Sequence, residues 1–479
     1  MKYSMSLLAL CTAILSGCAV GPDFKHPDVV TQTSYNQNGD ALSTDQRILL
    51  GQQLQTQWWT LFESKTLNGL IQQAIQNNHD ITIAKETLAQ ANEYVKAAQG
   101  SLLPQVGLTA SVNRQKYGVA MFGPSDFSIP PFTSYEFGPE ISWSPDLAGG
   151  KKRAIERQQA LAEYQSHQLN AAYVSLTAQV VQHALTIATA QAEIDITQQL
   201  IAEDQKNLQL VQAAFQGGVR TKVDVLTAQS QLDTDRTGLP ALQQKQSTAQ
   251  HALAILVGVA PADWTAPHFT LSEFNLPKNL SLSLPSELVH QRPDILAAEA
   301  NLHAASAAVG VATANLYPQI NLTANILQEA LTPSGLFKSV NNAWALAAGL
   351  TAPLYHGGTL KAEKRAAEHG YQAALAQYKQ IILQSFGQVA DRLQALQHDH
   401  DELEAQQQAV NTTQAFLELA RKSYQVGNTG ILPVEDATRQ HYRSQLGLIR
   451  SQSQRLSDTA QLFVALGGSP IVSEPSQNP

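Results

Sequence analysis

The stretch LLPQVGLTA at residues 102–110 decides the fold, because a close copy of it, LYPQINLTA, stands at residues 316–324. A second motif, DLAGG at 146–150, has its counterpart in LYHGG at 354–358. The two copies are about 210 residues apart each time. The chain is therefore an internal duplication, and each half is predicted to follow one plan: a helix, two strands and then two long helices.

Four segments alternate between apolar and polar residues with the period of two that a strand requires. They are predicted at about 104–114, 135–144, 318–328 and 343–352. Each has about the length that a tilted membrane strand needs, and aromatic residues stand near the ends. A half-buried sheet of a soluble domain would show the same alternation, so the pattern alone leaves both settings open.

Four strands cannot close into a barrel, and an open sheet edge in lipid would leave backbone groups unpaired. If the strands lie in a membrane, several copies of the chain must therefore complete one sheet. Glu136 and Glu140 fall on the polar side of the second segment. They would face the lumen of such a barrel and weakly favour cations, or they are plain solvated residues. The stretches 115–133 and 328–341 contain Pro and Gly and are predicted to be exposed loops.

Two long segments carry an apolar residue at every seventh position, which predicts coiled-coil seams. The helices are predicted at about 151–216 and 359–425, and their seams end at the equivalent residues Phe215 and Tyr424. At 1.5 Å per residue such a helix reaches roughly 100 Å, which is longer than a compact domain can use. A soluble coiled-coil rod would give the same pattern.

A return helix is predicted after each long helix, at about 222–258 and 433–466. The first is expected to be kinked or broken at Gly-Leu-Pro, residues 238–240, and the second half has no equivalent of this break. Asp224 is expected to cap the start of the first return helix.

The first 17 residues are predicted to be a signal peptide, with Lys2, a short apolar run and small residues before Cys18. LSGC at 15–18 has the form of a bacterial lipobox, so Cys18 is the expected lipidation site. Residues 18–56 would then be a lipidated N-terminal extension. An ordinary signal peptide with a chance cysteine is the alternative. Ala19 stands where Asp would retain a lipoprotein in the inner membrane, so the outer membrane is the expected location.

The composition argues against several function classes. Cys11 and Cys18 are the only cysteines, so a mature lipoprotein would have no thiol for a disulfide, a metal or a nucleophile. The formal charge is −8 without a basic block, which predicts no nucleic-acid partner. No stretch after the signal peptide approaches 18 uninterrupted apolar residues, so no transmembrane helix is predicted.

Sites for catalysis, cofactors and metals are also not expected. Gly-Gly-Lys-Lys at 149–152 lacks the flanking residues of a phosphate loop. His-Asp-His at 398–400 is expected to be solvated helix surface, because residues two apart on a helix point in different directions. No Ser-His-Asp arrangement is evident, and the chain is not expected to be an enzyme.

The sequence resembles the outer-membrane factor family of TolC-type ducts, and in particular its lipoprotein, NodT/OprM-like branch. The resemblance covers essentially all of the mature chain. It rests on GCAVGPDF at 17–24, QWW at 57–59, and RPDILAAE at 292–299, which leads into the LYPQI copy. The turn LAGG at 147–150 departs from the Phe-Gly-Arg pattern that is common in relatives.

The resemblance implies a mixed α/β membrane protein that works as a homotrimer. Four strands per chain would join a shared twelve-stranded transmembrane β-barrel, and the long antiparallel coiled-coil helices would form a periplasmic α-barrel. The implied domains are a first repeat at 57–265, a linker at 266–284, a second repeat at 285–467 and a C-terminal tail at 468–479. Segments 55–100 and 285–315, with the tail, would form a belt around the tunnel.

The function implied by the resemblance is that of a passive, gated exit duct in the outer membrane. It would carry drugs or other small toxic compounds, supplied by an inner-membrane pump of the resistance-nodulation-division type through a periplasmic adaptor protein. A duct for peptide or protein secretion is one alternative. A non-conducting lipoprotein scaffold that bridges the periplasm is another.

Leu432, Asp436 and Arg439 match the positions at which the family closes its periplasmic end. Their spacing places them on one helix face, so that a trimer would form rings of these side chains. An ordinary exposed Asp–Arg pair is the alternative. Their first-half counterparts, Val223, Thr227 and Ser230, carry no charge. The turns expected to dock the adaptor contain Gly217, Gly218, Val219, Arg220, Gly427, Asn428, Thr429 and Gly430.

Overall fold

A computed structural model describes residues 19–27, 32–37, 39–52, 54–117 and 130–468. The chain divides into two compact units, each assembled from three stretches of sequence. The sheet unit consists of Met1–Pro27, Thr87–Gln165 and Ala298–Tyr378, and the helix unit consists of Asp28–Glu86, Ser166–Ala297 and Lys379–Pro479. The predicted signal peptide, Cys18 and the predicted tail beyond Gly468 lie outside the described residues.

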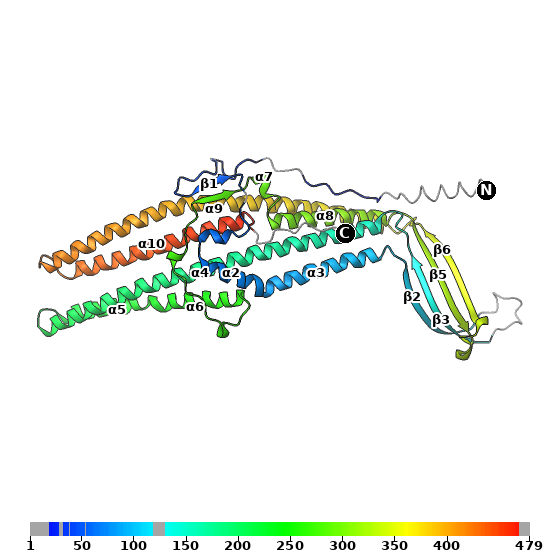
Figure 1. Cartoon of the computed structure of the whole chain (residues 1–479), viewed down its shortest axis with the longest axis horizontal. Coiled ribbons are helices and arrows are strands. Elements are labelled where there is room, and N and C mark those ends of the chain that lie inside the picture. The colour runs from blue at the N-terminus through cyan, green and yellow to red at the C-terminus, as the bar shows by residue number, and fades with distance from the viewer. Residues whose placement is uncertain (1–18, 28–31, 38, 53, 118–129, 469–479) are drawn as a thin grey trace. The chain divides into compact units, whose positions relative to one another are not determined.

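The sheet unit contains an antiparallel four-stranded sheet in the order β2-β3-β5-β6, in which β3 and β5 join the two repeats (Figure 1). The strands are β2 (Gln105–Gln115), β3 (Phe132–Trp143), β5 (Gln319–Ala330) and β6 (Asn342–Thr351). In the described part of the chain, the outer edges of β2 and β6 pair with no other strand. The sheet of one chain is therefore open on both sides.

One face of this sheet is apolar and bare. Val106 and Leu108 on β2 and Leu346 and Leu350 on β6 are all between 68% and 73% exposed. In a half-buried sheet of a soluble domain this face would be covered by the core. A large exposed apolar face instead suits contact with lipid. The structure thus favours the membrane setting over the soluble sheet that the alternation had left open.

The opposite face is polar and carries the two glutamates singled out in the sequence. Glu136 lies opposite Ser111 on β2, whose hydroxyl donates to it at 3.0 Å, and opposite Glu329 on β5. Glu140 lies opposite Asn325 on β5. The sequence analysis did not single out Glu329, which places a second carboxylate beside Glu136. Carboxylates therefore lie in the middle of the polar face. The side chains that β6 contributes to this face are mostly small.

Residues 19–26, named here the N-terminal strap, lie along the start of α4 (Gly150–Gln216). The amide of Val20 donates to the carbonyl of Ala148 at 3.0 Å. The buried guanidinium of Arg153 donates to the Val20 carbonyl at 3.2 Å and pairs with Asp23 at 2.6 Å. The ion pair with Arg153 gives a structural reason for the Asp of the GCAVGPDF motif, whereas position 20 contributes main-chain groups.

The strap also contacts α8 (Pro293–Ala314) of the second repeat. Gly21 has a φ of +94°, and a Cβ on it would stand 2.5 Å from the Cα of Gly310. Phe24 stacks on His303 with ring centroids 4.4 Å apart. Glycine at position 21 is therefore required both by its backbone angle and by the close approach of two main chains.

Replacing Gly21 with alanine is expected to displace the strap. The left-handed backbone costs roughly 1–3 kcal/mol for a residue with a side chain, and the clash with Gly310 adds to it. Cleavage by trypsin after Lys25 should become several-fold faster, as measured by the release of the N-terminal peptide. Gly39→Ala is the matched control, because Gly39 has a φ of +85° but nothing within 4 Å of its Cβ position. Equal cleavage rates in all three proteins would contradict the close approach.

The long helices run almost from the end of each strand pair to a tight turn. They are α4, α9 (Thr359–Gln425) and the return helices α5 (Lys222–Arg236), α6 (Gly238–Leu256) and α10 (Leu432–Ala465). The first return helix is divided at Thr237, next to the predicted Gly-Leu-Pro break, whereas α10 is continuous. The middle of each predicted seam is buried, for example Val180 and Ile187 on α4 and Val389 and Leu396 on α9. The prediction is wrong at the ends of the seams, where Phe215 and Tyr424 are each 40% exposed.

The remaining elements are short, apart from three helices that precede the strands. These are α2 (Lys65–Asn77), α3 (His79–Gly100) and α8. Among the described residues, α8 alone is long and apolar enough to cross a membrane by length and composition, and 56% of that window is buried inside the protein, as in a core helix. The short elements are β1 (Arg47–Leu50), η1 (Trp58–Phe62), η3 (Pro261–Asp263), η4 (Leu271–Glu273), β4 (Asn279–Leu282), α7 (Pro285–Leu288), η5 (Pro333–Gly335) and η6 (Ser339–Asn341).

The core of the helix unit gathers aromatic residues around the QWW motif. Trp58 and Phe62 are fully buried, and the Trp58 ring lies 5.7 Å from that of Phe463 at the end of α10. Nearby, β1 and β4 form a parallel pair that the sequence analysis did not predict. The QWW motif stands at the start of the first repeat in the sequence. In the structure it packs against the end of the second repeat.

Arg292 explains the RPD motif at the start of α8. Its guanidinium binds Asp294 through two nitrogens at 2.9 and 2.7 Å, and donates to the Ala465 carbonyl at 2.7 Å and to the Gln388 side chain at 2.9 Å. Arg292 itself is buried. One side chain therefore ties the start of α8 to the last carbonyl groups of α10 and to α9.

The expectation for His-Asp-His at 398–400 is partly wrong. His398 is exposed, but Asp399 is buried against α10, where Asp458 lies beside it. Asp458 also binds Arg392 at 2.7 Å. Burial, followed by the charge and hydrogen bond of Asp458, raises the pKa of Asp399 to about 7. Asp399 lies on the face of α9 that packs against α10. The sequence argument considered only that residues two apart on a helix point in different directions, and not which of them faces a neighbouring helix.

Asp399→Asn is expected to stabilise the protein at alkaline pH. The folded protein keeps the Asp399 proton up to a pKa of about 7, whereas an unfolded Asp loses it near 3.8. The free-energy penalty on folding is thus absent below about pH 3.8, grows as the pH rises to 7, and is fully present above it. The variant should melt a few degrees higher than the parent at pH 8 and at the same temperature at pH 4. Asp401→Asn, at an exposed position of the same helix, should change neither value.

Candidate gate and docking turns

The two helix-ending turns in the helix unit have the same backbone geometry. Gly218 and Gly427 both have a φ of +76°. The amide of Val219 donates to the Ala214 carbonyl at 2.9 Å, and that of Asn428 to the Ser423 carbonyl at 3.0 Å. Such a left-handed glycine with a bond back across six residues is the common way to end a helix sharply. The duplication therefore extends to the hydrogen bonds of its turns.

The return helices begin differently. Thr221 caps α5, and its hydroxyl and the Asp224 carboxylate form a reciprocal capping box. The predicted role of Asp224 as the cap is thus corrected: Thr221 is the N-cap, and Asp224 is the third residue of the helix. These hydrogen bonds lower the pKa of Asp224. α10 begins at Leu432 without a side-chain cap, with Pro433 in its first turn.

The three predicted gate residues lie on the first turns of α10. Leu432 is 60% exposed, and the Asp436 side chain is 64% exposed. Arg439 donates to Asp436 at 2.5 Å and is itself mostly covered. The structure brings Asp436 and Arg439 together as a pair on one helix face and leaves Leu432 and Asp436 free to contact another molecule.

A set of acidic residues that the sequence analysis missed lies beside this pair. Asp235 on α5 lies close to Asp204 on α4, and burial, followed by the hydrogen bonding and charge of Asp235, raises the pKa of Asp204 to about 7. The positive charge of Arg439 acts in the opposite direction. Asp204 and Asp235 are about equally far in sequence from the turn that joins the antiparallel helices α4 and α5. This equal spacing could have predicted that the two side chains lie close together. Arg439 thus faces carboxylates of both helical hairpins.

Direct contacts also join the two hairpins here. Asn207 on α4 donates to Glu435 on α10, and Glu203 on α4 lies 3.6 Å from Arg421 on α9. Between them is a cavity of about 250 Å³. A cluster of Leu208, Val211 and other seam residues packs within the first hairpin, and a smaller one around Leu417 packs within the second. Polar groups therefore link the hairpins, whereas apolar seams hold each hairpin together.

The links between the two hairpins are made by charged and polar side chains. Among the described residues, no group of three or more His, Cys, Asp or Glu side chains could hold a metal ion. Links made of charged and polar side chains near a surface are weak individually and sensitive to pH and salt. Links of this kind join α4 to α10 and to α9.

Comparison with known proteins shows similarity along nearly the whole chain. The family model described as "Outer membrane efflux protein" matches residues 70–259 and 284–468. The chain is 28% identical over 471 residues to the probable efflux pump outer membrane protein TtgC of Pseudomonas putida, covering 98% of this chain and 96% of that protein. It is 32% identical over 417 residues to the pyoverdine export outer membrane protein OpmQ of the same species, covering 86% and 87%.

Solved structures agree with these relatives. The outer-membrane channel OprN superposes with a TM-score of 0.83 at 26% identity, covering 94% of this chain and 99% of that one. The two matched segments of the family model correspond to the two halves of the duplication. The chain belongs to the outer membrane efflux protein family, and it is the outer-membrane channel component of an efflux system.

Proposed function

We propose that three copies of this chain form a passive, gated duct through the outer membrane. The observation that carries the proposal is the open four-stranded sheet with one bare apolar face. Lipid contains no water to satisfy free strand edges, so the edges of β2 and β6 must be paired by neighbouring copies. A lipid on Cys18 would hold the strap, and with it the start of α4, at the same membrane.

The duct performs no covalent chemistry in this proposal. It receives its cargo from an inner-membrane pump of the resistance-nodulation-division type through a periplasmic adaptor protein. The adaptor docks at the turns formed by residues 217–220 and 427–430, which are exposed ends of the helical hairpins. In the closed state, the side chains of Leu432 narrow the opening to an apolar ring, and Asp436 adds a ring of negative charge.

The cargo is proposed to be small organic compounds that are toxic to the cell. Relatives are named for toluene efflux and for pyoverdine export, both of which concern small molecules. A duct for secreted peptides or proteins would have the same fold and is the second candidate. A relative named as a cation efflux protein widens the range of cargo that such a duct passes.

Three measurements test this proposal. Purified protein reconstituted in planar lipid bilayers should give discrete conductance steps, and its mass in detergent should correspond to three chains. A strain that lacks the gene should become more sensitive to several unrelated toxic compounds, and the wild-type gene should restore resistance. A monomeric, non-conducting protein would contradict the duct and favour the scaffold. Loss of a secreted protein with unchanged drug sensitivity would favour the secretion duct.

A further inference from the structure

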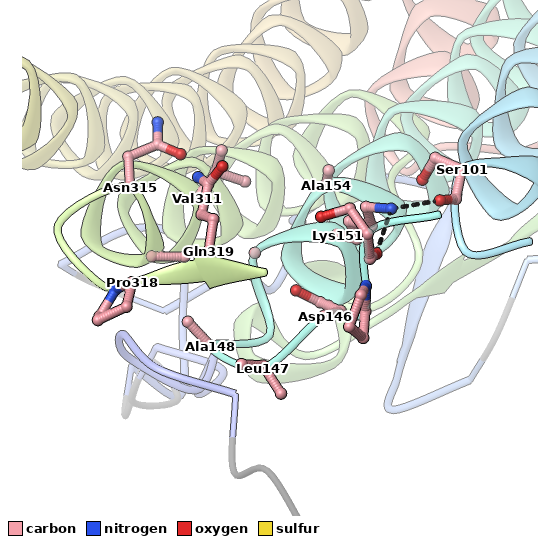
Figure 2. Close-up of a pocket in the computed structure, with 14 residues that line it drawn as sticks. Ser101, Asp146, Leu147, Ala148, Lys151, Ala154, Val311, Asn315, Pro318 and Gln319 are labelled. Atoms are coloured by element: carbon pink, nitrogen blue, oxygen red, sulfur yellow. Dashed lines mark hydrogen bonds between the residues drawn. The ribbon is translucent and has the colours of Figure 1, made fainter. Parts of the chain in front are cut away.

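Charged side chains that are partly covered by the protein usually have partners for their polar atoms. Lys151 at the start of α4 is an example, because its ammonium group donates to the carbonyl groups of Ser101 and Ser144 at 2.6 and 2.7 Å (Figure 2). One cluster in the helix unit is different, because it combines buried charges with polar atoms that have no partner. It lies where α9, α10 and the N-terminal extension meet.

Two aspartates form the centre of this cluster. Asp399 on α9 is 8% exposed, and Asp458 beside it on α10 is 2% exposed. Both carboxylate oxygens of Asp458 have donors, namely Arg392 at 2.7 Å and Gln454 at 2.6 Å. Within the described part of the chain, Oδ2 of Asp399 is buried and has no hydrogen-bond partner. Of the two neighbouring carboxyl groups, only that of Asp458 is therefore fully satisfied.

The guanidinium of Arg455 lies close to both aspartates. Arg455 stands three residues before Asp458 on α10, is 3% exposed, and its charge acts on Asp399. One of its terminal nitrogens donates to Asp45 of the N-terminal extension and to the Gln46 side chain, the latter at 3.3 Å. Its Nε has no acceptor among the residues that the structure describes. Asp45 and Asp399 are therefore alternative partners for one buried cation.

Residues 43–46, named here the clip, attach the N-terminal extension to the helices. The Ser43 amide donates to the Gln397 side chain of α9 at 2.8 Å. The Gln46 side chain is buried and donates to the Pro277 carbonyl at 2.9 Å. These contacts are polar, and the clip is followed directly by β1, whose pairing with β4 extends over only four residues. Such a short strand pair is not stable by itself, so the clip is needed to keep it in place.

Asp45 is the charged residue of the clip, and two side chains of the helices hold it. Arg455 donates to Asp45, and a ring nitrogen of His400 on α9 lies 3.6 Å from it. Burial would raise the pKa of Asp45, but the hydrogen bond and the charge of Arg455 lower it below its ordinary value. His400 strengthens this attraction only while its ring is protonated, that is, towards lower pH.

The charge of Asp399 depends on the pH near neutrality. Burial, followed by the charge of Asp458 and hydrogen bonding to it, raises the pKa of Asp399 to about 7. Glu402 acts in the same direction and Arg455 in the opposite one. The other charged or titratable groups of the cluster are Arg392, His400 and Glu404 on α9 and Asp45 in the clip. Two ionised carboxylates side by side in a buried place require a cation, and the free Nε of Arg455 is available for this purpose.

We propose that the clip is a pH-sensitive attachment of the N-terminal extension. While Asp399 is protonated, Arg455 stays with Asp45 and holds the clip on α9 and α10. When Asp399 loses its proton, the guanidinium turns to the new carboxylate through its free Nε, and Asp45 is released. Loss of the proton from His400 acts in the same direction. The clip, and β1 after it, therefore detach as the pH rises. The switch acts within one chain and does not depend on the proposed trimer.

Hydrogen exchange tests this attachment. The whole chain in detergent is labelled at pH 6 and at pH 8.5, and the peptide that contains the clip and β1 is followed by mass spectrometry. After correction for the intrinsic exchange rate, protection of this peptide should fall about ten-fold between the two pH values. Asp399→Asn cannot become charged and should keep its protection at pH 8.5. Asp401→Asn, at an exposed position of the same helix, should behave like the parent.

Two further readings make the result specific. Asp45→Asn removes the charge that Arg455 holds, so its clip should exchange rapidly at both pH values. The buried part of α2 around Ile71 should stay protected throughout, because release of the clip is local. A parent whose clip is equally protected at both pH values would overturn the proposal. A loss of protection that is the same in Asp399→Asn as in the parent would also overturn it, and so would an equal loss around Ile71.

The protonation of Asp399 has its own measurement. The infrared band of protonated carboxyl groups should lose intensity in the parent between pH 6 and pH 8.5. This loss should be smaller in Asp399→Asn and unchanged in Asp401→Asn. A residue that only fills space between α9 and α10 would not affect this band. Identical infrared changes in the parent and in Asp399→Asn would overturn the role of Asp399 as the group that releases the clip.

Discussion

Trimers that carry Asp436→Ala and Arg439→Ala together are expected to show a closed-state conductance several-fold above that of the parent. The double variant removes the negative ring and the pair that fixes it. It also removes the positive charge that acts on Asp204 of the other hairpin, so that the start of α10 is held less firmly beside α4. The measurement is single-channel recording in planar bilayers without adaptor.

The first repeat provides the control for this experiment. Thr227 and Ser230 are the counterparts of Asp436 and Arg439, and they carry no charge. Thr227→Ala with Ser230→Ala should leave the closed-state conductance unchanged. If the charged pair can be removed with no rise in conductance, the pair is an ordinary surface ion pair and the gate lies elsewhere.

Replacing Arg292 with alanine is expected to cost the largest amount of stability of any substitution considered. Hydrogen bonds to a charged group contribute roughly 1.5–3 kcal/mol each and are not additive, so a loss of about 3–4 kcal/mol is expected. The Ala465 carbonyl at the end of α10 would lose its donor, and Gln388 would lose its partner. The melting temperature, followed by circular dichroism in detergent, should fall by about 3–4 °C.

Two further variants separate the geometry from the charge. Arg292→Lys keeps the positive charge but cannot bind Asp294 through two nitrogens, so it should lose an intermediate amount of stability. Arg236→Ala removes an exposed arginine that lies 3.7 Å from Asp233, and such pairs contribute at most about 1 kcal/mol. Similar small losses for Arg292→Ala and Arg236→Ala would show that Arg292 does not hold the helices together.

The fold class was predictable because its signals are local and repeated. A period of two marks β2 and β5 within nine residues, and a period of seven marks α4 and α9 within a few turns. Duplication supplied an independent check, since each pattern occurs twice. The proline and glycine near residue 238 also predicted the division of the first return helix. These features depend on the backbone and on side-chain alternation, which a single sequence shows directly.

Contacts between distant segments were not predictable in the same way. Arg292 meets a carbonyl 173 residues away, and Asp23 meets a guanidinium 130 residues away. A heptad pattern tells which face of a helix is buried but not which helix covers it, so the partners of Asp204 and Asp399 could not be named. The motifs around Asp23 and Arg292 were recognised as specific, and only the structure supplies the physical reason for each.

The roles of the gate and docking residues remain predictions, because they depend on the assembled duct and not on the fold of one chain. Position 432 and the turn residues 217–219 and 427–430 are exposed in a single chain, as a gate or a docking surface must be, and Arg220 is half-buried. Exposure is necessary for both roles and specific to neither. The conductance experiment distinguishes a gate from ordinary surface, because it measures a property that only the assembled duct has.

The two free strand edges and the bare apolar face also matter before the duct exists. A newly exported chain must cross the periplasm with this surface exposed to water, and unpaired edges of this kind are templates for aggregation. The chain is therefore most prone to aggregation before it has assembled. A chain that is made faster than protomers can meet is therefore expected to aggregate through these edges.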